Sequence, residues 1–508
     1  MKITCDTKKK TGMKREEYLD RIYGCWLGKN VGGTIGVAYE GNTDFLSAPL
    51  KMPSEMVAND DLDLQLVWLD ILRKKGVGIT SDDLAEGWLN NITYACDEYG
   101  VAIANLKAGL RPPVTGYYNN WFRNGMGAPI RSEIWACIAS GKPEVAGWYA
   151  LQDASVDHWD EGVYGEIFLA AMESAAFSGN PVHSLIETAL SFIPETSSLH
   201  RAVTLTVSLH GQGKTLEETR SGILRSFGHH NFTDCVQNIS FIIAGLLHGE
   251  GDFLKTIVSA VNCGYDTDCT GATVGAILGI MKGRKQLLRE GYRAGEEVVA
   301  GCGIRGIDVP ATLKELTEWT AGIGNEVENN RGLPIIEKPF QMYGIPEFSP
   351  PFTFRFLVSE PFAPENVEQA ERDMLNNTCS IFRKAVFNTM YFDLNNYAGR
   401  PGSAIFLKTL MELPEKKKVK LFPVSTDGIK MWIDGRLILS HHQHSSFLPA
   451  PHRPGSPIVQ TELEKGEHEL LLEVMCREGA PEFGWIAADE SNHLAMDIQY
   501  RWEKVQNG

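Results

Sequence analysis

The spacing of apolar residues changes part-way along the chain, and this change constrains the fold more than any other feature. Residues 16–29 and 60–75 carry Leu, Ile, Trp and Tyr at intervals of three and four, the pattern of amphipathic helices. Residues 164–177 are apolar on almost every side, as in a buried central helix. Later runs such as 468–474 are short and apolar, and turn signals such as Asp434-Gly435 separate them. The sequence therefore predicts an all-α part followed by a β-sandwich.

The predicted domain boundaries follow from the same change. A chain of 508 residues is longer than one hydrophobic core usually organises, so we expect a multidomain protein. We place an all-α domain at residues 1–330 and a β-sandwich domain at residues 356–508, with a short helix near residues 365–375. Residues 331–355 are rich in proline and predict a linker that lies over the surface.

Composition and charge exclude several classes of partner. The formal net charge is −16, which repels phosphate groups, so we expect neither nucleic acid nor membrane as a partner. The apolar stretches are too short to cross a bilayer, and the N-terminal residues lack the pattern of a secretory signal. The 10 cysteines are scattered without a CxxC pair, which is typical of reduced thiols. We therefore expect a cytoplasmic protein.

Two groups of aspartates stand at the start of predicted helices. The first is Asn-Asp-Asp-Leu-Asp at residues 59–63, and the second is Asp-Thr-Asp at residues 266–268. Either group alone is explained as a helix cap. Capping does not account for both, because adjacent carboxylates repel and raise one another's pKa unless a cation lies between them. Oxygen ligands indicate a hard cation, Mg²⁺ first and then Mn²⁺ or Ca²⁺.

Four motifs, and the segment that follows the third of them, resemble in this order those of the ADP-ribosylglycohydrolase family. Residues 28–40 (GKNVGGTIGVAYE) are similar to its glycine-rich opening, which ends in a glutamate. Residues 59–61 are similar to its Thr/Ser-Asp-Asp element. Residues 125–131 are similar to its glycine-rich substrate loop, and residues 153–165 to the segment that follows. Residues 264–269 are similar to its Gly-Gly-Asp-Thr-Asp-Thr/Ser element.

This resemblance implies an all-α hydrolase that cleaves the glycosidic bond at the anomeric carbon of ADP-ribose, with two Mg²⁺ ions, a metal-bound water and an acidic residue. The metal ligands that it implies are Asn59, Asp60, Asp61, Asp266, Asp268 and Cys269. The catalytic residues that it implies are Glu40, Asp61 and Asp266, with Glu40 as acid/base or as a residue behind the ligands. The substrate-binding residues that it implies are Gly125, Gly127 and His158.

Two positions depart from the family pattern. Asn59 and Cys269 stand where the family has Thr or Ser hydroxyls, and a sulfur atom is a poor ligand for Mg²⁺. Two other interpretations therefore stay open. The chain can be a hydrolase of the same fold for a different glycoside or nucleoside, or a non-catalytic ligand-binding protein with a degraded metal site.

The second domain adds an expectation about partners. Its pattern resembles the β-sandwiches attached to bacterial carbohydrate-active enzymes. We expect a small-molecule or ADP-ribosylated substrate, and carbohydrate as a ligand of the C-terminal domain. Trp432 and Trp485 are candidates for a sugar-stacking face, although the same residues are also typical of a sandwich core.

Overall fold

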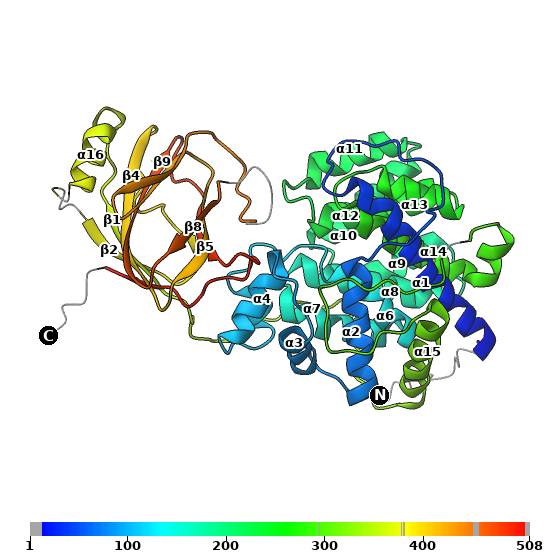
Figure 1. Cartoon of the computed structure of the whole chain (residues 1–508). Coiled ribbons are helices and arrows are strands. Elements are labelled where there is room, and N and C mark those ends of the chain that lie inside the picture. Colours follow the sequence, from blue (N-terminus) through cyan, green and yellow to red (C-terminus); the bar gives the residue numbers. More distant parts are fainter. Residues whose placement is uncertain (1–12, 294, 377, 379–381, 451–456, 503–508) are drawn as a thin grey trace, which may run out of the picture. The chain divides into compact units, whose positions relative to one another are not determined.

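The computed structural model describes residues 13–293, 295–376, 378, 382–450 and 457–502. These residues form two compact units (Figure 1). The first unit comprises residues 13–94, 111–117 and 122–346, and the second comprises residues 95–110, 118–121 and 347–502. The first unit is built of helices and the second contains the strands, which confirms the predicted fold class.

The first unit is a helical bundle whose central members are apolar on most sides. Its helices are α1 (Arg15–Gly36), η1 (Val37–Tyr39), α2 (Asp60–Lys75), α3 (Ser81–Asn90), α5 (Val114–Tyr117), η2 (Pro129–Arg131), α6 (Ser132–Ile138), α7 (Pro143–Asp157), α8 (Glu161–Ala176), α9 (Val182–Leu190), α10 (Ser198–Gly211), α11 (Leu216–Phe227), α12 (Cys235–His248), α13 (Phe253–Val261), α14 (Thr267–Arg289) and α15 (Leu313–Asn329).

Helices α1 and α14 pack backbone against backbone. Every fourth residue of α1 from Gly24 to Gly36 faces a carbonyl group of α14. A Cβ atom added to Gly28 would lie 1.9 Å from the carbonyl oxygen of Gly275, and one added to Gly32 would lie 1.9 Å from that of Gly271. Only hydrogen in place of a side chain allows such an approach. The antiparallel pair therefore brings the end of α1 beside the start of α14.

The second unit is a β-sandwich with two short helices of its own and one from the N-terminal half. Its elements are α4 (Asp97–Lys107), β1 (Phe354–Ser359), η3 (Pro364–Asn366), α16 (Val367–Leu375), β2 (Phe382–Phe387), β3 (Tyr391–Phe392), β4 (Ser403–Leu413), β5 (Lys417–Ser425), β6 (Ile429–Ile433), β7 (Arg436–His441), β8 (Val459–Leu463), β9 (Gly466–Cys476), β10 (Phe483–Ala488) and β11 (Gln499–Arg501).

Both sheets of the sandwich are antiparallel. The larger has the order β2-β1-β4-β9-β6-β7, with β11 also paired to β4, and the smaller has the order β3-β10-β5-β8. One apolar core contains residues from both sheets, such as Leu407 on β4 and Leu421 on β5. Val101 of α4 belongs to the same core, which explains why residues 95–110 join this unit.

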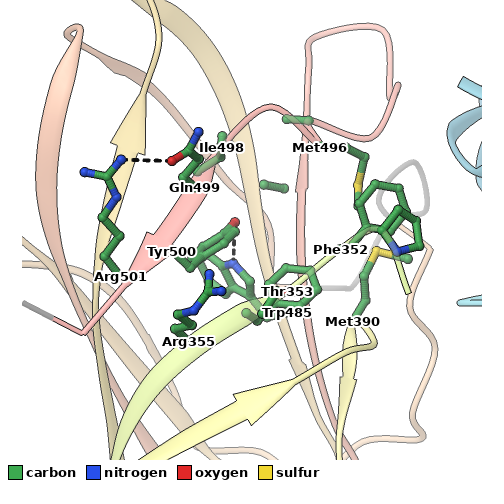
Figure 2. A pocket seen from close by; sticks show the side chains of 14 residues that line it. Phe352, Thr353, Arg355, Met390, Trp485, Met496, Ile498, Gln499, Tyr500 and Arg501 are labelled. Carbon is green, nitrogen blue, oxygen red and sulfur yellow. Dashed lines mark hydrogen bonds between the residues drawn. The ribbon is translucent and has the colours of Figure 1, made fainter. Parts of the chain in front are cut away.

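The predicted hairpin and helix of the second unit are both present. Asp434 and Gly435 have φ values of 50° and 76° and connect β6 to β7, as expected of a two-residue turn. Trp432 and Trp485 are buried, with 3% and 0% of their surface exposed, so they belong to the core and not to a sugar-stacking face. Figure 2 shows Trp485 beside Tyr500, whose hydroxyl oxygen accepts a hydrogen bond from the indole at 2.8 Å.

The proline-rich segment is fixed to the first unit over part of its length. Ile336 and Phe340 are buried there, and the backbone N–H of Phe340 donates to the carbonyl of Phe192 at 2.8 Å. The first unit includes this segment as far as residue 346. The expected boundaries of the linker stay a prediction.

Two further observations concern the protein's environment. No helix among the described residues is both long and apolar enough to cross a membrane. The cysteines within the described part of the chain form no disulfide bond.

The contact between α1 and α14 generates the first testable prediction. Gly28→Ala places a methyl group against the Gly275 carbonyl, so we expect a loss of about 3 kcal/mol or more in the free energy of unfolding. Gly322→Ala is the matched control, because Gly322 is an exposed residue of α15 with no atom within 4 Å of an added Cβ. That change should stabilise the protein by about 0.5–1 kcal/mol. Urea unfolding measures both, and equal stability of the two variants would contradict the packing argument.

Candidate functional site

The two acidic groups meet at the starts of α2 and α14. Oxygen atoms of Asp61 and Asp268 and the Sγ atom of Cys269 all lie within 4.8 Å of one another, and the three residues are buried. This is the one group of three or more His, Cys, Asp or Glu side chains with such geometry in the described residues. The structure thus joins three of the six predicted ligands directly.

The two residues that depart from the family pattern connect the two acidic groups. The Asn59 side chain caps α2 by accepting a hydrogen bond from the backbone N–H of Asp61 at 2.9 Å. Its Nδ2 lies 3.3 Å from Oδ2 of Asp268, and Sγ of Cys269 donates to Oδ2 of Asp61 at 3.7 Å. Each substitution therefore supplies a donor to the carboxylate of the other group.

Crowding of negative charge perturbs the acidic groups. Burial, together with the charges of Asp61 and Glu40, raises the pKa of Asp268 to about 7. Burial and neighbouring carboxylates also raise the pKa values of Asp60 and Asp266 well above the ordinary value. Oδ1 of Asp268 is buried and accepts no hydrogen bond from a residue that the structure describes. A cation would relieve this repulsion and fill the unused coordination position of Asp268.

Lys29 supplies a buried positive charge to the site. Its Nζ atom lies 3.2 Å from Oδ1 of Asp61 and 2.8 Å from Oε1 of Glu133, and donates to the carbonyl of Ile130 at 2.9 Å. The attraction of these carboxylates outweighs burial and keeps the pKa of Lys29 above its ordinary value. This ammonium group therefore ties α1 to α2, to α6 and to the glycine-rich loop.

Glu40 lies just beyond η1, at the end of the segment that begins with α1. Its side chain is exposed, and its charge contributes to the raised pKa values of Asp266 and Asp268. The structure thus brings Glu40 near the acidic groups while leaving it open to solvent.

A second buried ion network holds the glycine-rich loop. Arg131 is fully buried and pairs with Asp153 at 2.8 Å and with Asp157 at 2.9 Å. The Arg131 charge lowers the pKa of Asp157 to about 2 despite its burial. A backbone bridge also joins Gly125 to Asp234 at the start of α12. The loop is therefore fixed from both ends.

His158 is enclosed by the protein. Its ring is fully buried, its Nδ1 lies 3.0 Å from Asp157, and its Nε2 accepts the backbone N–H of Ala128 at 3.2 Å. This geometry makes His158 a support for the loop that contains Gly125 and Gly127. The substrate-binding roles of these three residues stay predictions.

The sequence argument passed over Lys29, Glu133 and Arg131. Lys29 follows Ile22 and Trp26 at helical spacing, so it lies on the buried face of α1. A charged residue at such a position needs a buried partner. That signal was present in the sequence, but the identity of the partner was not.

A family model described as ADP-ribosylglycohydrolase matches residues 14–321. A solved structure titled "ADP-ribosylglycohydrolase-related protein complex" is 18% identical, and the similarity covers 62% of this chain and 99% of that chain with a TM-score of 0.39.

Two other solved structures cover smaller shares of the chain. An anti-sigma factor domain-containing protein from Clostridium clariflavum is 12% identical over 30% of this chain and 48% of its own, with a TM-score of 0.21. The PA14 domain of the MpAFP antifreeze protein is 11% identical over 33% of this chain and 100% of its own, with a TM-score of 0.22. A search among curated proteins finds no match. The structural similarities are too weak to support an argument.

The support of the loop by Asp234 generates a prediction about pH. Burial raises the pKa of Asp234 to about 7, whereas an unfolded aspartate titrates near about 3.9. Between these values the folded state binds more protons than the unfolded state, so stability falls as pH rises through this window. Asn keeps the side-chain oxygen that accepts from Val236 and Gln237 but does not titrate.

We therefore expect Asp234→Asn to remove this decline. The variant should gain stability relative to the original protein between about pH 4.5 and about pH 8, as measured by urea unfolding. The same change at Asp252, the exposed cap of α13, is the matched control. A stability difference between variant and original protein that does not change with pH would contradict the prediction.

Proposed function

Because the chain belongs to the ADP-ribosylglycohydrolase family, we propose that its first unit hydrolyses the glycosidic bond at the anomeric carbon of ADP-ribose. This proposal rests on one observation. The carboxylates of Asp61 and Asp268 are buried and lie close together, and Oδ1 of Asp268 has no hydrogen-bond donor among the described residues. Burying these like charges lowers the stability of the folded protein unless a cation binds between them. Such an unfavourable arrangement is typical of functional sites, which favours a metal-dependent activity.

The residues present fit a divalent cation. Asp61 and Asp268 offer carboxylate oxygens, which suit Mg²⁺, Mn²⁺ or Ca²⁺, and Asp60, Asp266 and the Asn59 amide complete the predicted set. When bound, such an ion acts as a Lewis acid that orients ribose hydroxyls and makes water a stronger nucleophile. Cys269 is the poorest candidate ligand, since burial raises the pKa of its thiol and its Sγ donates to Asp61.

The protein side chains supply orientation and proton transfer. Lys29 holds Asp61 in place by a direct ion pair, and through the Ile130 carbonyl it positions the glycine-rich loop for backbone contacts with the substrate. Glu40 is the exposed carboxylate near the acidic groups, so it can exchange a proton with the attacking water or with the leaving atom. Cleavage at an anomeric carbon develops positive charge on the ring, which nearby carboxylates stabilise.

The activity is tested by the release of ADP-ribose. The full chain with Mg²⁺ is incubated with ADP-ribosyl-arginine, an ADP-ribosylated serine peptide and O-acetyl-ADP-ribose, and free ADP-ribose is measured by chromatography. Asp268→Asn removes the charge of the unpartnered carboxylate, so we expect turnover to fall by more than the ~10–100-fold that is typical of residues behind the ligands.

Asp63→Asn is the matched control. Asp63 lies on the same helix, but its carboxylate accepts hydrogen bonds from Tyr94 at 2.7 Å and from the backbone of Gly301 at 2.8 Å. This variant should keep its turnover. Full activity of Asp268→Asn would rule out the proposed role of the site, and inactivity of the original protein on all three substrates would favour a different glycoside or a binding function.

We also propose that the site holds one divalent cation instead of the two that the resemblance implies. Lys29 and Cys269 already engage the two oxygens of Asp61, and Asn59 donates to Oδ2 of Asp268, which leaves Oδ1 of Asp268 for a cation. These donors occupy positions that a second ion would need. Equilibrium dialysis against Mn²⁺ with elemental analysis should give one ion per chain, and none in a variant that carries both Asp61→Asn and Asp268→Asn. Two ions per chain would contradict this proposal.

A further inference from the structure

A hollow on the first unit lies apart from the acidic site. Its volume is about 680 Å³, within the range of about 300–1,000 Å³ found for small-molecule sites. It is lined by residues of α7, by Trp159 beyond that helix, by Ser81 and Pro113, and by the proline-rich segment at residues 335–343. No residue of the two acidic groups (59–63 and 266–269) and none of the glycine-rich loop lines it.

Four aromatic rings line this hollow, of which Phe340 is buried in its wall. Trp148 is half-buried on α7, Trp159 follows that helix and is 8% exposed, and Tyr343 is 64% exposed on the opposite segment. Flat rings with one polar edge suit ligands that present both C–H surfaces and hydroxyl groups, because each ring has an apolar face and a hydrogen-bonding tip.

Several polar groups of the hollow are available for a ligand, although the Ser155 hydroxyl donates to the Leu151 carbonyl. The carbonyl oxygen of the Gln152 side chain accepts from the backbone of Ser81 at 3.3 Å, whereas its amide nitrogen donates to no described residue. The Gln341 amide, the Tyr343 hydroxyl and the indole N–H of Trp148 likewise have no hydrogen-bond partner in the part of the chain that the structure describes. Amides, a hydroxyl and an indole beside these aromatic rings make a set of neutral donors and acceptors.

The charge of the lining excludes an anionic ligand. Glu337 is the one lining residue with a formal charge, and no Lys or Arg is present to pair with phosphate. The neighbouring Lys338 pairs with Glu144 at 3.0 Å and lies over the ring of Phe192. ADP-ribose, with its diphosphate, is therefore a poor fit for this hollow.

The walls are fixed before any ligand binds. Backbone N–H groups of Ile336 and Met342 donate to the Glu144 carbonyl at 3.0 Å and to the Tyr164 hydroxyl at 3.3 Å. Phe340 is buried between them. A preformed site loses less entropy on binding, which favours weakly interacting neutral ligands.

A pocket of the second unit is smaller and has fewer unpaired polar side chains among the described residues. Its volume is about 270 Å³, and four of its polar side chains are paired with one another: Trp485 donates to Tyr500, and Arg501 donates to Gln499 at 2.9 Å (Figure 2). Its aromatic rings are mostly core residues. The expectation of carbohydrate therefore fits the hollow of the first unit better than this pocket.

We propose that the hollow lined by Trp148, Gln152, Trp159, Gln341 and Tyr343 binds a neutral oligosaccharide. Sugar rings stack on the aromatic faces, and their hydroxyl groups bond to the two side-chain amides. The site is independent of the hydrolytic site, so it serves to hold the protein on a glycan or a glycosylated partner.

Isothermal titration calorimetry of the full chain with maltose, cellobiose and N,N′-diacetylchitobiose tests the proposal. We expect saturable binding of at least one disaccharide. Trp148→Ala and Gln152→Ala should each weaken it by about tenfold or more. Tyr343→Ala should weaken it too, and this exposed position leaves folding intact. Trp319→Ala, at another half-buried tryptophan on a helix of the same unit, is the matched control and should leave binding unchanged.

Two results of the calorimetric titrations would overturn the proposal, and a third comes from competition with ADP-ribose. One is the absence of binding by all three disaccharides, and the other is binding that survives both Trp148→Ala and Tyr343→Ala. Asp268→Asn should bind the disaccharide as the original protein does, so failure of the hydrolytic site and failure of the saccharide site are distinguishable. Competition by ADP-ribose for the same disaccharide would show that the hollow accepts the anionic ligand and would also contradict the proposal.

Discussion

The close contact between α1 and α14 is the constraint on which the site depends. Lys29 lies on α1 between two of the glycines that touch α14, and Glu40 follows the end of the same helix. Asp266 and Asp268 stand at the start of α14. If side chains separated the two backbones, the start of α14 and its carboxylates would lie farther from Lys29 and Glu40. The glycines therefore shape the chemistry, although none of them is expected to bind the metal.

The charge balance of the site follows from this packing. Burying several carboxylates in one place is unfavourable, and the structure offsets part of that cost with one buried lysine instead of leaving the whole cost to a metal. Lys29 bonds to α2, to α6 and to the glycine-rich loop, so the group that compensates the charge also sets the distance between the acidic groups and the loop. A point charge with several donors suits such a junction.

Sequence reasoning succeeded where a short-range rule decides the structure. Helix α2 begins at Asp60 because Asn59 caps it, and the Asp434-Gly435 turn requires two residues that tolerate positive φ. It failed where a partner far away in the chain decides. The pairing of Gly28 with Gly275 and of Lys29 with Glu133 depends on how helices pack, and α4 joins the sandwich although its local pattern resembles its helical neighbours. The acidic groups could be predicted from the sequence because neighbouring aspartates repel one another in any fold and therefore indicate a cation site.

The two departures from the family pattern make physical sense as a pair. A hydroxyl in either position can coordinate a cation, whereas Asn59 and Cys269 each present a donor that reaches the carboxylate of the opposite group. These cross-links reduce the repulsion between α2 and α14 without any ion, so the acidic groups are brought together by the protein alone. Because the ligands are already in place, a cation would lose less of its binding free energy in ordering them. The same donors leave fewer carboxylate oxygens free for a second ion. The same substitutions that weaken the resemblance therefore support a preformed site for a single cation.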